Sequence, residues 1–413
     1  MKHRLHLWFE QHRVGRLDQA TNGQRTFTYD DGWLAHDERF PISLSMPLHG
    51  ETFPDPLTRA FFGGLLPDEN VRARLAKHLG VSARNEFAML REVGRECAGA
   101  LALLPDDETP GPASTEPPRL LDDLTLANLL RELPRRPLLA GRELRLSLAG
   151  AQDKIAIVMV GERIALPAPG APTSHILKVP IANYEATVAN EFFCMQLAAR
   201  CGIDTPGTSL RVVDGMPILL IERFDRHIDA NGTLRRLHQE DCCQALGIPP
   251  DCKYQSEGGP GFAALFRLLT DHSTRAAADR VQLLQRVLFH FLVGNGDAHG
   301  KNFSLLLTRY GARLAPIYDV MSTLVYPDLS RRMAMKVGSR REFAEVQPEH
   351  WAAFAKEIGM SAPAVRDRLR ELAASLPTTA RQLATSLPAL ADTPLIDRLV
   401  EGIAERCRAV PSR

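Results

Sequence analysis

The chain has 413 residues, of which 45 % are hydrophobic and 24 % are charged, and its formal net charge is +1. This composition argues against a disordered chain, and the length exceeds one ordinary core, so two or three packed subdomains are expected. The near-neutral charge provides no general field that would attract nucleic acid. One local basic run is interpreted as a solvated surface, with nucleic-acid binding as the alternative: Arg331, Arg332, Lys336, Arg340 and Arg341.

Apolar runs and cysteine spacing bear on the cellular compartment. No apolar run approaches the roughly 18 residues of a membrane span, and residues 1–8 alternate charged and apolar side chains, unlike a signal peptide. We therefore expect a cytoplasmic protein without a membrane segment. The seven cysteines include no Cys-x-x-Cys pair, and a zinc site at His238, Cys242, Cys243 and Cys252 matches no common spacing. Reduced, buried thiols are the favoured interpretation.

The first 105 residues contain strand-like runs followed by helix-like segments, which predicts a small α+β subdomain over residues 1–105. The segments are strands at 6–9 and 26–29 and helices at 57–66 and 71–79. Residues 106–119 are rich in proline and poor in apolar side chains, which is typical of a linker.

Residues 120–236 predict a second α+β region. Apolar patterning favours helices at 120–133 and 186–199, and strands at 155–160, 175–179 and 216–221. Residues 237–413 are expected to be mainly helical from Gln239 onward. Residues 281–293 are apolar nearly all round, which predicts a central buried helix, and residues 348–408 are helical again.

The predicted central helix runs directly into Gly294-Asn295-Gly296-Asp297, a place where a rigid element delivers polar groups to a loop. Asp297 and Asn302 have the D-x-x-x-x-N spacing of a protein-kinase catalytic loop. In that loop the aspartate accepts the hydroxyl proton and the asparagine binds Mg²⁺. His299 and Lys301 lie inside the loop, and they either shape it or, for Lys301, face the transferred phosphate.

A hairpin follows Asn302, with strands expected at 303–307 and 314–318. A hairpin of this length would return Asp319 beside Asn302, where Asp319 would supply a second ligand for the metal.

A cation for nucleotide phosphates is found upstream of the loop. Lys178 lies in a strand-like run, as the ATP-binding lysine of kinases does, and the helix that follows offers Glu185 or Glu191 as its partner, with Glu191 preferred. The next strand ends at Glu222-Arg-Phe-Asp225, where a hinge would offer backbone groups to adenine and Asp225 would reach the ribose. The order of these elements favours phosphoryl transfer.

No G-x-G-x-x-G precedes the lysine strand. In its place is Ser147-Leu-Ala-Gly-Ala-Gln-Asp-Lys154, whose glycine and small neighbours would let backbone NH groups approach phosphates. The candidate nucleotide contacts in this segment are Ala149, Gly150, Ala151, Gln152 and Lys154.

Several blocks of this sequence resemble the HipA kinases of bacterial toxin-antitoxin modules, and the likeness covers nearly the whole chain. The blocks are 147–154, 174–180, 190–196, 221–226, 238–244, 253–254 with 258–260, 296–304 and 317–322, and in the N-terminal part 61–62, 65–67, 93–95 and 98–99.

The resemblance implies a two-lobed protein-kinase-like α+β fold, with the ATP-binding strands and hinge in residues 120–236 and a helical catalytic lobe in residues 237–413. It also implies Mg²⁺-ATP as donor and serine or threonine of a protein as acceptor. By motif match, Asp297 is the base, Asn302 and Asp319 bind magnesium and Lys178 binds ATP. Glu222 and Phe224 match the hinge, and Gln239 matches a further nucleotide contact.

Family members are silenced by autophosphorylation of the serine that matches Ser147, and the added negative charge explains why such a group would repel ATP phosphates. They act with a small helix-turn-helix antitoxin, the HipB type, that binds operator DNA, so DNA contact would be mainly indirect. Known targets of the family include aminoacyl-tRNA synthetases. Gly296, Ala298 and Asp153 depart from the family pattern without removing a catalytic group.

Two other functions remain open at this point. A small-molecule phosphotransferase would share the Asp297 and Asn302 spacing, but the Ser147 block and the N-terminal part argue against it. A non-catalytic regulator that only binds antitoxin and DNA is disfavoured by the intact Lys178, Asp297 and Asp319.

Overall fold

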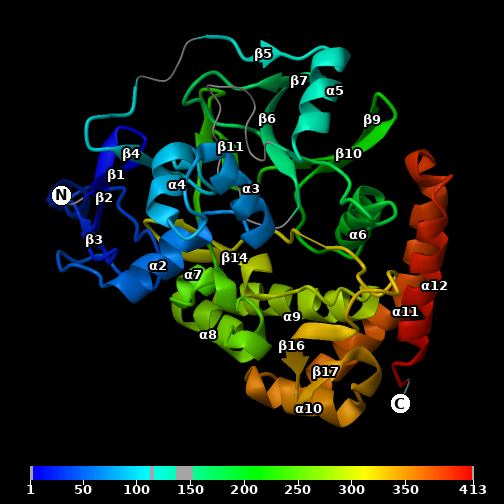
Figure 1. Ribbon diagram of the computed structural model, residues 1–413. Helices are drawn as coiled ribbons and strands as arrows, with labels where there is room; N and C mark the ends of the chain where they lie inside the picture. Colours follow the sequence, from blue (N-terminus) through cyan, green and yellow to red (C-terminus); the bar gives the residue numbers. More distant parts are fainter. Residues whose placement is uncertain (1–2, 112–115, 136–151, 412–413) are drawn as a thin grey trace. The chain divides into compact units, whose positions relative to one another are not determined.

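The computed structural model describes residues 3–111, 116–135 and 152–411, which form two compact units (Figure 1). The first unit comprises residues 1–179, 211–251 and 305–311, and the second comprises 180–210, 252–304 and 312–413. The chain therefore crosses between the units several times. These two units do not test the domain bounds expected from the sequence, which stay predictions.

The N-terminal sheet of the first unit is antiparallel, with strand order β3-β2-β1-β4. Its strands are β1 (His3–Phe9), β2 (His12–Gln19), β3 (Arg25–Tyr29) and β4 (Leu101–Pro105). Between β3 and β4 the chain forms α1 (Asp31–Leu34), α2 (Asp55–Gly64), α3 (Glu69–Leu79) and α4 (Glu86–Val93). The expected strands and helices of this region are confirmed.

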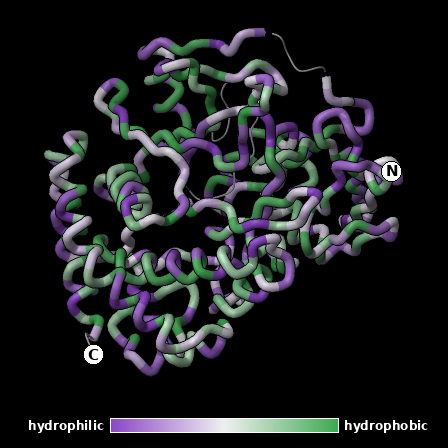
Figure 2. Tube along the Cα trace, turned by 180° about the vertical axis from the view of Figure 1, so that it is seen from behind, coloured by the Kyte–Doolittle hydropathy of each residue, from purple (hydrophilic) through white to green (hydrophobic). Residues whose placement is uncertain are grey.

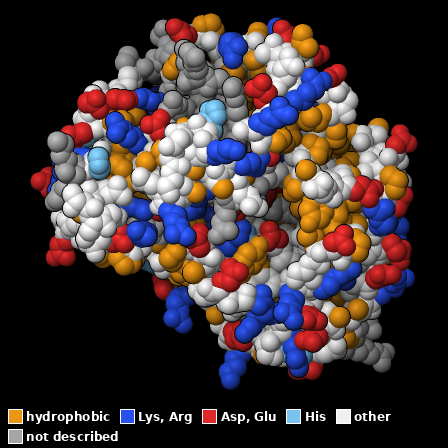
Figure 3. All heavy atoms as spheres, viewed as in Figure 1, with side chains coloured by type: hydrophobic (Ala, Val, Ile, Leu, Met, Phe, Trp, Pro, Cys, Tyr) orange, Lys and Arg blue, Asp and Glu red, His pale blue; other side chains and the backbone are white. Residues whose placement is uncertain are grey.

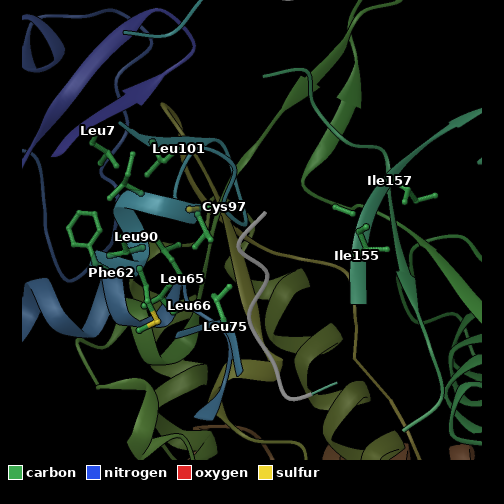
Figure 4. Close-up of a cluster of buried hydrophobic side chains, with 14 of the residues drawn as sticks. Leu7, Phe62, Leu65, Leu66, Leu75, Leu90, Cys97, Leu101, Ile155 and Ile157 are labelled. Atoms are coloured by element: carbon green, nitrogen blue, oxygen red, sulfur yellow. The ribbon is translucent and has the colours of Figure 1, made fainter. Parts of the chain in front are cut away.

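One buried apolar cluster holds the first unit together (Figure 4). Leu7 from β1, Phe62 from α2, Leu90 from α4 and Ile155 from β6 (Lys154–Val160) are all fully buried. Burial of each such side chain contributes roughly 1.5–3 kcal/mol. The cluster draws on two sheets of the unit, so the N-terminal sheet and the sheet that contains β6 share one core.

The second sheet has the order β5-β7-β6-β8-β10-β9. Its remaining strands are β5 (Arg119–Leu120), β7 (Arg163–Leu166), β8 (His175–Lys178), β9 (Thr208–Val213) and β10 (Met216–Glu222). Helix α5 (Asp123–Glu132) lies between β5 and β6 in the chain, and Asp122 caps its N-terminus. Of the expected linker 106–119, the described residues 106–111 and 116–118 contain no helix or strand, whereas residue 119 begins β5.

Residue 239, where mainly helical structure was expected to begin, lies in a strand, so that prediction was wrong here. Strand β13 (His238–Asp241) follows the hairpin β11 (Arg226–Ile228) and β12 (Leu234–Arg236), and it belongs to a three-stranded sheet of order β13-β14-β15. Helix α7 (Cys242–Ala245) follows with a capping box between Asp241 and Gln244. Cys242 and Cys243 are buried, as expected, and Cys252 is half-buried.

The second unit is mostly helical. Its helices are α6 (Thr187–Arg200), α8 (Phe262–His272), α9 (Ala276–Val293), α10 (Pro348–Glu357), α11 (Ala362–Ser386) and α12 (Pro394–Arg408). Hydrophobic and hydrophilic residues alternate along the helix next to the C-terminus in Figure 2, which matches its one buried face. Helix α9 is buried without interruption from Leu283 to Val293, so the predicted central helix is confirmed.

A short hairpin in the second unit was not predicted. Strand β16 (Arg332–Val337) pairs with β17 (Arg340–Glu342). Lys and Arg side chains gather over this hairpin in Figure 3, and Arg331, Arg332, Lys336 and Arg340 are exposed. Some of them face carboxylates, as in the pair between Arg332 and Glu342 at 3.2 Å. This pairing agrees with the interpretation of the basic run as a solvated surface.

No described helix is long and apolar enough to cross a membrane.

Glu240 of β13 makes the stability of the first unit depend on pH. Its carboxyl is fully buried, accepts a hydrogen bond from the Leu44 amide at 2.8 Å, and burial raises its pKa to about 8. The stabilising contribution of such an acid is complete below its unfolded pKa and is lost as the pH rises through the folded value. We expect Glu240→Gln, which is neutral throughout, to gain stability relative to wild type between about pH 5 and pH 8, by on the order of 1 kcal/mol per pH unit.

Urea unfolding of wild type, Glu240→Gln and the exposed-site control Glu257→Gln at several pH values measures this difference. The neighbouring His238 has a pKa lowered to about 4, chiefly by burial, so its opposite contribution is lost only in acid and cancels between the variants. Parallel stability profiles for wild type and Glu240→Gln would contradict the expectation.

Candidate active site

The chain turns sharply at the C-terminus of α9. Gly294 has φ 74° and Asn295 donates its backbone N–H to the His290 carbonyl at 2.9 Å. Arg406 of α12 donates from Nε to the Leu292 carbonyl at 2.8 Å and from Nη2 to the Val293 carbonyl at 2.9 Å. A cation at the carbonyl end of a helix is favourable, because the unpaired carbonyls carry partial negative charge. Arg406 therefore fixes the point at which α9 enters the loop.

Asp297 is the one residue between Phe291 and Gly300 that is not buried. The hydroxyl of Tyr254 donates to its Oδ1 at 2.6 Å, and the Asp297 amide donates to the Asn295 side-chain oxygen at 3.0 Å. The Tyr254 ring also meets the His299 ring edge-on, with centroids 5.2 Å apart. A buried loop thus presents a single carboxylate in a fixed orientation.

Gly296 has no space for a side chain. A Cβ there would lie 2.9 Å from the Arg332 carbonyl oxygen and 3.0 Å from the Thr323 hydroxyl. The Gly296 amide donates to that hydroxyl at 2.8 Å, and its carbonyl accepts from the Ala334 amide at 2.8 Å. This packing explains the glycine that departs from the family pattern.

Asn302 lies at the end of a short 3-10 helix (Gly300–Asn302), with its side-chain amide donating to the Asp297 carbonyl at 2.8 Å. His299 and Lys301 are buried. Since the Asn302 nitrogen binds Asp297, its amide oxygen is the atom suited to a cation. This hydrogen bond from the Asn302 side chain to the Asp297 backbone joins the two residues that the D-x-x-x-x-N spacing identified.

After Asn302 the chain runs through β14 (Ser304–Thr308) and β15 (Gly311–Leu314) and returns to the loop. The Tyr318 hydroxyl donates to the Lys301 carbonyl at 2.7 Å, and the Thr323 amide donates to the Gly294 carbonyl at 3.0 Å. Asp319 lies between these two contacts and is half-buried. The chain returns to the loop, but the second strand is Gly311–Leu314 and not the expected 314–318. The metal role of Asp319 stays a prediction.

Helix α6 is attached to the same segment of the second unit. Asn190 accepts from the Ser322 amide at 2.9 Å and donates to the Ser322 carbonyl at 3.0 Å. Glu191 beside it is buried, whereas Glu185 is exposed and forms an ion pair with Arg398. The engagement of Glu185 elsewhere favours Glu191 as the functional glutamate of this region.

In the first unit, Lys154 of β6 and Lys178 of β8 are directly opposite one another in the antiparallel pair. Opposite residues project to the same face of a sheet, and like charges there repel unless negative groups lie against them. Gln152 donates to the Val179 carbonyl at 2.7 Å and so attaches the preceding segment to β8. Two ammonium groups on one face are suited to a polyanion such as a nucleotide phosphate chain.

Buried and less buried side chains alternate from residue 222, the last of β10, to residue 225. Glu222 is exposed and Phe224 half-buried, whereas Arg223 and Asp225 are buried, as expected for extended chain whose neighbouring side chains point to opposite sides. Glu222 and Phe224 are therefore the less buried residues of this segment, and their hinge role stays a prediction. Their nucleotide contacts stay predictions.

Asp225 points inward into an ion-pair network. Its carboxylate accepts from Arg223 Nε at 2.9 Å and Nη2 at 2.7 Å, and from the Gly99 amide at 2.7 Å. Glu96 lies 3.5 Å from Arg226, which also contacts Asp225 at 3.1 Å. Burial raises the pKa of Asp225, but Arg223 and Arg226 outweigh it and hold the pKa below its usual value. The structure thus gives Asp225 a structural role, and its predicted ribose contact is disfavoured.

Gln239 is half-buried, and its Oε1 is a buried atom with no hydrogen-bond partner among the described residues. A buried acceptor of this kind is costly unless a ligand donates to it, which agrees with the predicted nucleotide contact. Ser147, Ala149, Gly150 and Ala151 lie outside the described residues.

The available donors fit magnesium only in part. No cluster of three or more His, Cys, Asp or Glu able to hold a metal occurs among the residues that the structure describes. Mg²⁺ is usually bound through one or two carboxylates, with water and substrate phosphates as further ligands. Asn302 and Asp319 fit this pattern, in which the protein supplies few ligands and the nucleotide supplies the remaining oxygens.

Sequence reasoning missed Tyr254 and Arg406 as functional residues. Tyr254 lies within a block that resembles the HipA kinases, but its bond to Asp297 spans 43 positions. Arg406 lies on an amphipathic helix, α12, and nothing in its local sequence indicates that it binds the carbonyls at the end of α9.

Comparison with known proteins gives the class of this chain. Residues 5–104 match the HipA N-terminal domain family, and residues 146–380 match the HipA-like C-terminal domain family. Y4mE of Sinorhizobium fredii, which its name classes as a kinase only provisionally, is 45 % identical over 411 residues, covering 98 % of each chain. The serine/threonine-protein kinase toxin HipA of Shewanella oneidensis is 30 % identical over 334 residues, covering 76 % of this chain and 75 % of that protein.

A solved structure agrees with these matches. HipA of Shewanella oneidensis MR-1, in complex with HipB and operator DNA, has a TM-score of 0.85 and 27 % identity, covering 98 % of this chain and 96 % of that one. The fold is therefore the α+β, two-lobed fold of proteins named as kinase toxins. The chain belongs to the HipA family.

Proposed function

We propose that this chain is a serine/threonine protein kinase that transfers phosphate from ATP to a protein, with Asp297 as general base. The observation that supports it most is the loop itself, in which one part-exposed carboxylate is oriented by Tyr254 and tied to Asn302. A base must be positioned before its proton affinity matters. Membership of the HipA family agrees with this assignment.

The other described residues of the site act on the nucleotide, the metal or the loop. Lys154 and Lys178 bind nucleotide phosphates, Glu222 and Phe224 line the adenine position, and Gln239 donates or accepts a further nucleotide contact. Asn302 and Asp319 bind Mg²⁺, which neutralises charge on the phosphates and orients them when bound. Asp297 accepts the hydroxyl proton of the acceptor, and Lys301 and His299 maintain the loop around it.

The partners are inferred from relatives. We propose that a HipB-like helix-turn-helix antitoxin binds this chain and links it to operator DNA, as HipB and operator DNA accompany the Shewanella HipA. The acceptor is a protein, with aminoacyl-tRNA synthetases as the leading class. We expect the toxin to act in the cytoplasm, where both partners would be encountered.

Ser147 is the proposed self-silencing site. Purified protein with Mg²⁺-ATP is expected to incorporate phosphate at Ser147 and then to lose activity, because about −1.5 to −2 added charges repel ATP phosphates. Ser147→Ala should bind ATP normally and stay active for longer. Mass spectrometry and calorimetry measure both effects, with the exposed serine in Ser256→Ala as control.

Two results would oppose this proposal. Loss of nucleotide binding in Ser147→Ala would make that serine structural. Phosphate appearing only in a small molecule, never in protein, would favour the small-molecule phosphotransferase instead.

A further inference from the structure

A cavity of about 490 Å³ lies in the second unit, among the end of α12, helix α10, the start of α11 and the segment after β17. Its volume is within the range of small-molecule pockets. None of the residues proposed to bind nucleotide, metal or acceptor lines it. The cavity is therefore separate from the residues proposed for phosphoryl transfer.

The inner wall of the cavity is aromatic. Phe291 of α9 stacks on Phe343 with ring centroids 5.6 Å apart and meets Trp351 of α10 edge-on at 5.1 Å. Phe291 and Trp351 are buried, and Leu369 and Val410 extend the apolar surface. An apolar chain placed here would be bound more tightly with each methylene that it buries.

The edge of the cavity carries an excess of positive charge. Arg366, Arg370 and Arg406 line it together with a single acidic residue, Glu405. The Nε of Arg370 donates to the Pro411 carbonyl at 2.9 Å, and Arg406 donates to the carbonyls at the end of α9. Arg366 Nε donates to Asp367 Oδ1 at 3.4 Å, and Arg370 Nη1 lies 3.8 Å from the same oxygen. The three arginines therefore face two carboxylates, Glu405 and Asp367, and one positive charge remains in excess. Ion pairs at exposed sites are weak, so an incoming anion can replace Asp367 as the partner.

We propose that this cavity binds an amphipathic monoanion, namely a medium-chain carboxylate. Its hydrocarbon chain lies against Phe291, Phe343 and Trp351. Its carboxylate is bound by Arg366 and Arg370. The combination of an aromatic wall and a positive edge selects this class over neutral lipids and over polyanions, which would leave the wall empty.

The site also bears on the loop that contains Asp297. A Cβ on Gly294 would lie 2.8 Å from Arg406 Cζ, and one on Gly296 would lie 3.7 Å from the Phe343 ring. Two residues that line the cavity therefore lie next to the loop glycines. A ligand that orders Phe343 and Arg406 stabilises the hydrogen bonds of Asn295 and Gly296, so binding is coupled to loop stability.

The binding test uses bromododecanoate, whose bromine quenches nearby tryptophan. The chain has three tryptophans, and Trp351 lines the cavity. We expect saturable quenching of the full-length protein, without nucleotide, and loss of that quenching in Trp351→Phe. Absence of saturable quenching, or the same quenching in Trp351→Phe, would overturn the site.

The charge test uses a matched pair of variants on α11. Arg370→Gln is expected to weaken dodecanoate binding roughly tenfold, since a hydrogen bond between charged groups is lost. Arg368→Gln, which removes an exposed arginine that pairs with Glu371 and does not line the cavity, should bind as wild type does. Equal affinity for dodecanoate and dodecanol, or equal effects of the two variants, would overturn the assignment of an anionic ligand.

Hydrogen exchange measures the coupling without any catalytic assay. We expect dodecanoate to slow amide exchange at residues 294–297 in wild type, and the same slowing to require roughly tenfold more dodecanoate in Arg370→Gln. Bound ligand with unaltered exchange in that segment would overturn the coupling.

Discussion

Replacing Asp297 with asparagine is expected to slow phosphoryl transfer by orders of magnitude while leaving nucleotide binding nearly unchanged. Asparagine has the same shape, and its amide oxygen still accepts from Tyr254, but it takes up no proton at neutral pH. A positioned general base contributes roughly 10²–10⁴-fold to a rate. We therefore expect a loss of that size in the rate of phosphate incorporation, with ATP affinity measured by calorimetry unaltered.

Two variants calibrate this result. Asp271→Asn changes an exposed aspartate of α8 and should transfer phosphate as wild type does. Tyr254→Phe removes the hydroxyl that orients Asp297, so its rate should fall to a value between those of Asp271→Asn and Asp297→Asn. Wild-type rates in Asp297→Asn would exclude Asp297 as the base.

Removing the charge of Asp225 is expected to destabilise the first unit strongly. Asp225→Asn leaves Arg223 and Arg226 buried beside a neutral amide, and breaking a buried ion pair by changing one partner costs about 3–5 kcal/mol. Because its folded pKa lies below the unfolded value, the contribution of Asp225 is present at neutral pH and disappears only in acid. Urea unfolding at neutral pH measures the loss.

Asp229→Asn is the matched control, because Asp229 also pairs with an arginine, Arg235 at 2.9 Å, but at the surface. Exposed pairs contribute little to stability. Equal unfolding midpoints for the two variants would contradict a structural role for the network.

Elements with strong local patterns were predictable from the sequence. Helix α9 was found because its buried residues form one apolar run, and β8 and β10 because each is a short apolar segment bounded by turns. The spacing of Asp297 and Asn302 identified the loop for the same reason, since both residues lie within one short segment. Local sequence patterns therefore located the loop that contains Asp297 and Asn302.

Two of the strands that were not predicted, β13 and β16, have no such pattern. Strand β13 reads as polar, yet His238 and Glu240 are buried by distant residues, including Ile42 and Leu44. Strand β16 buries Met333, Ala334 and Met335 in succession, so the alternation typical of a half-buried strand is absent. Tertiary packing determined both strands.

Long-range pairing also explains why nothing in the sequence indicated the ion-pair network around Asp225. Its position after a hinge strand predicted a ribose contact, but Gly99, with Glu96 close by, lies more than 120 positions earlier in the chain and makes the aspartate part of a buried network. A carboxylate gives no local indication of whether its partner will be an arginine or a ligand.

The phosphoproteome of cells that produce this chain, compared with that of cells that produce Asp297→Asn, tests most directly whether it is a protein kinase. We predict new phosphoserine or phosphothreonine sites on one or a few proteins, besides Ser147, in the wild-type culture alone. Identical protein phosphorylation in the two cultures would contradict the assignment.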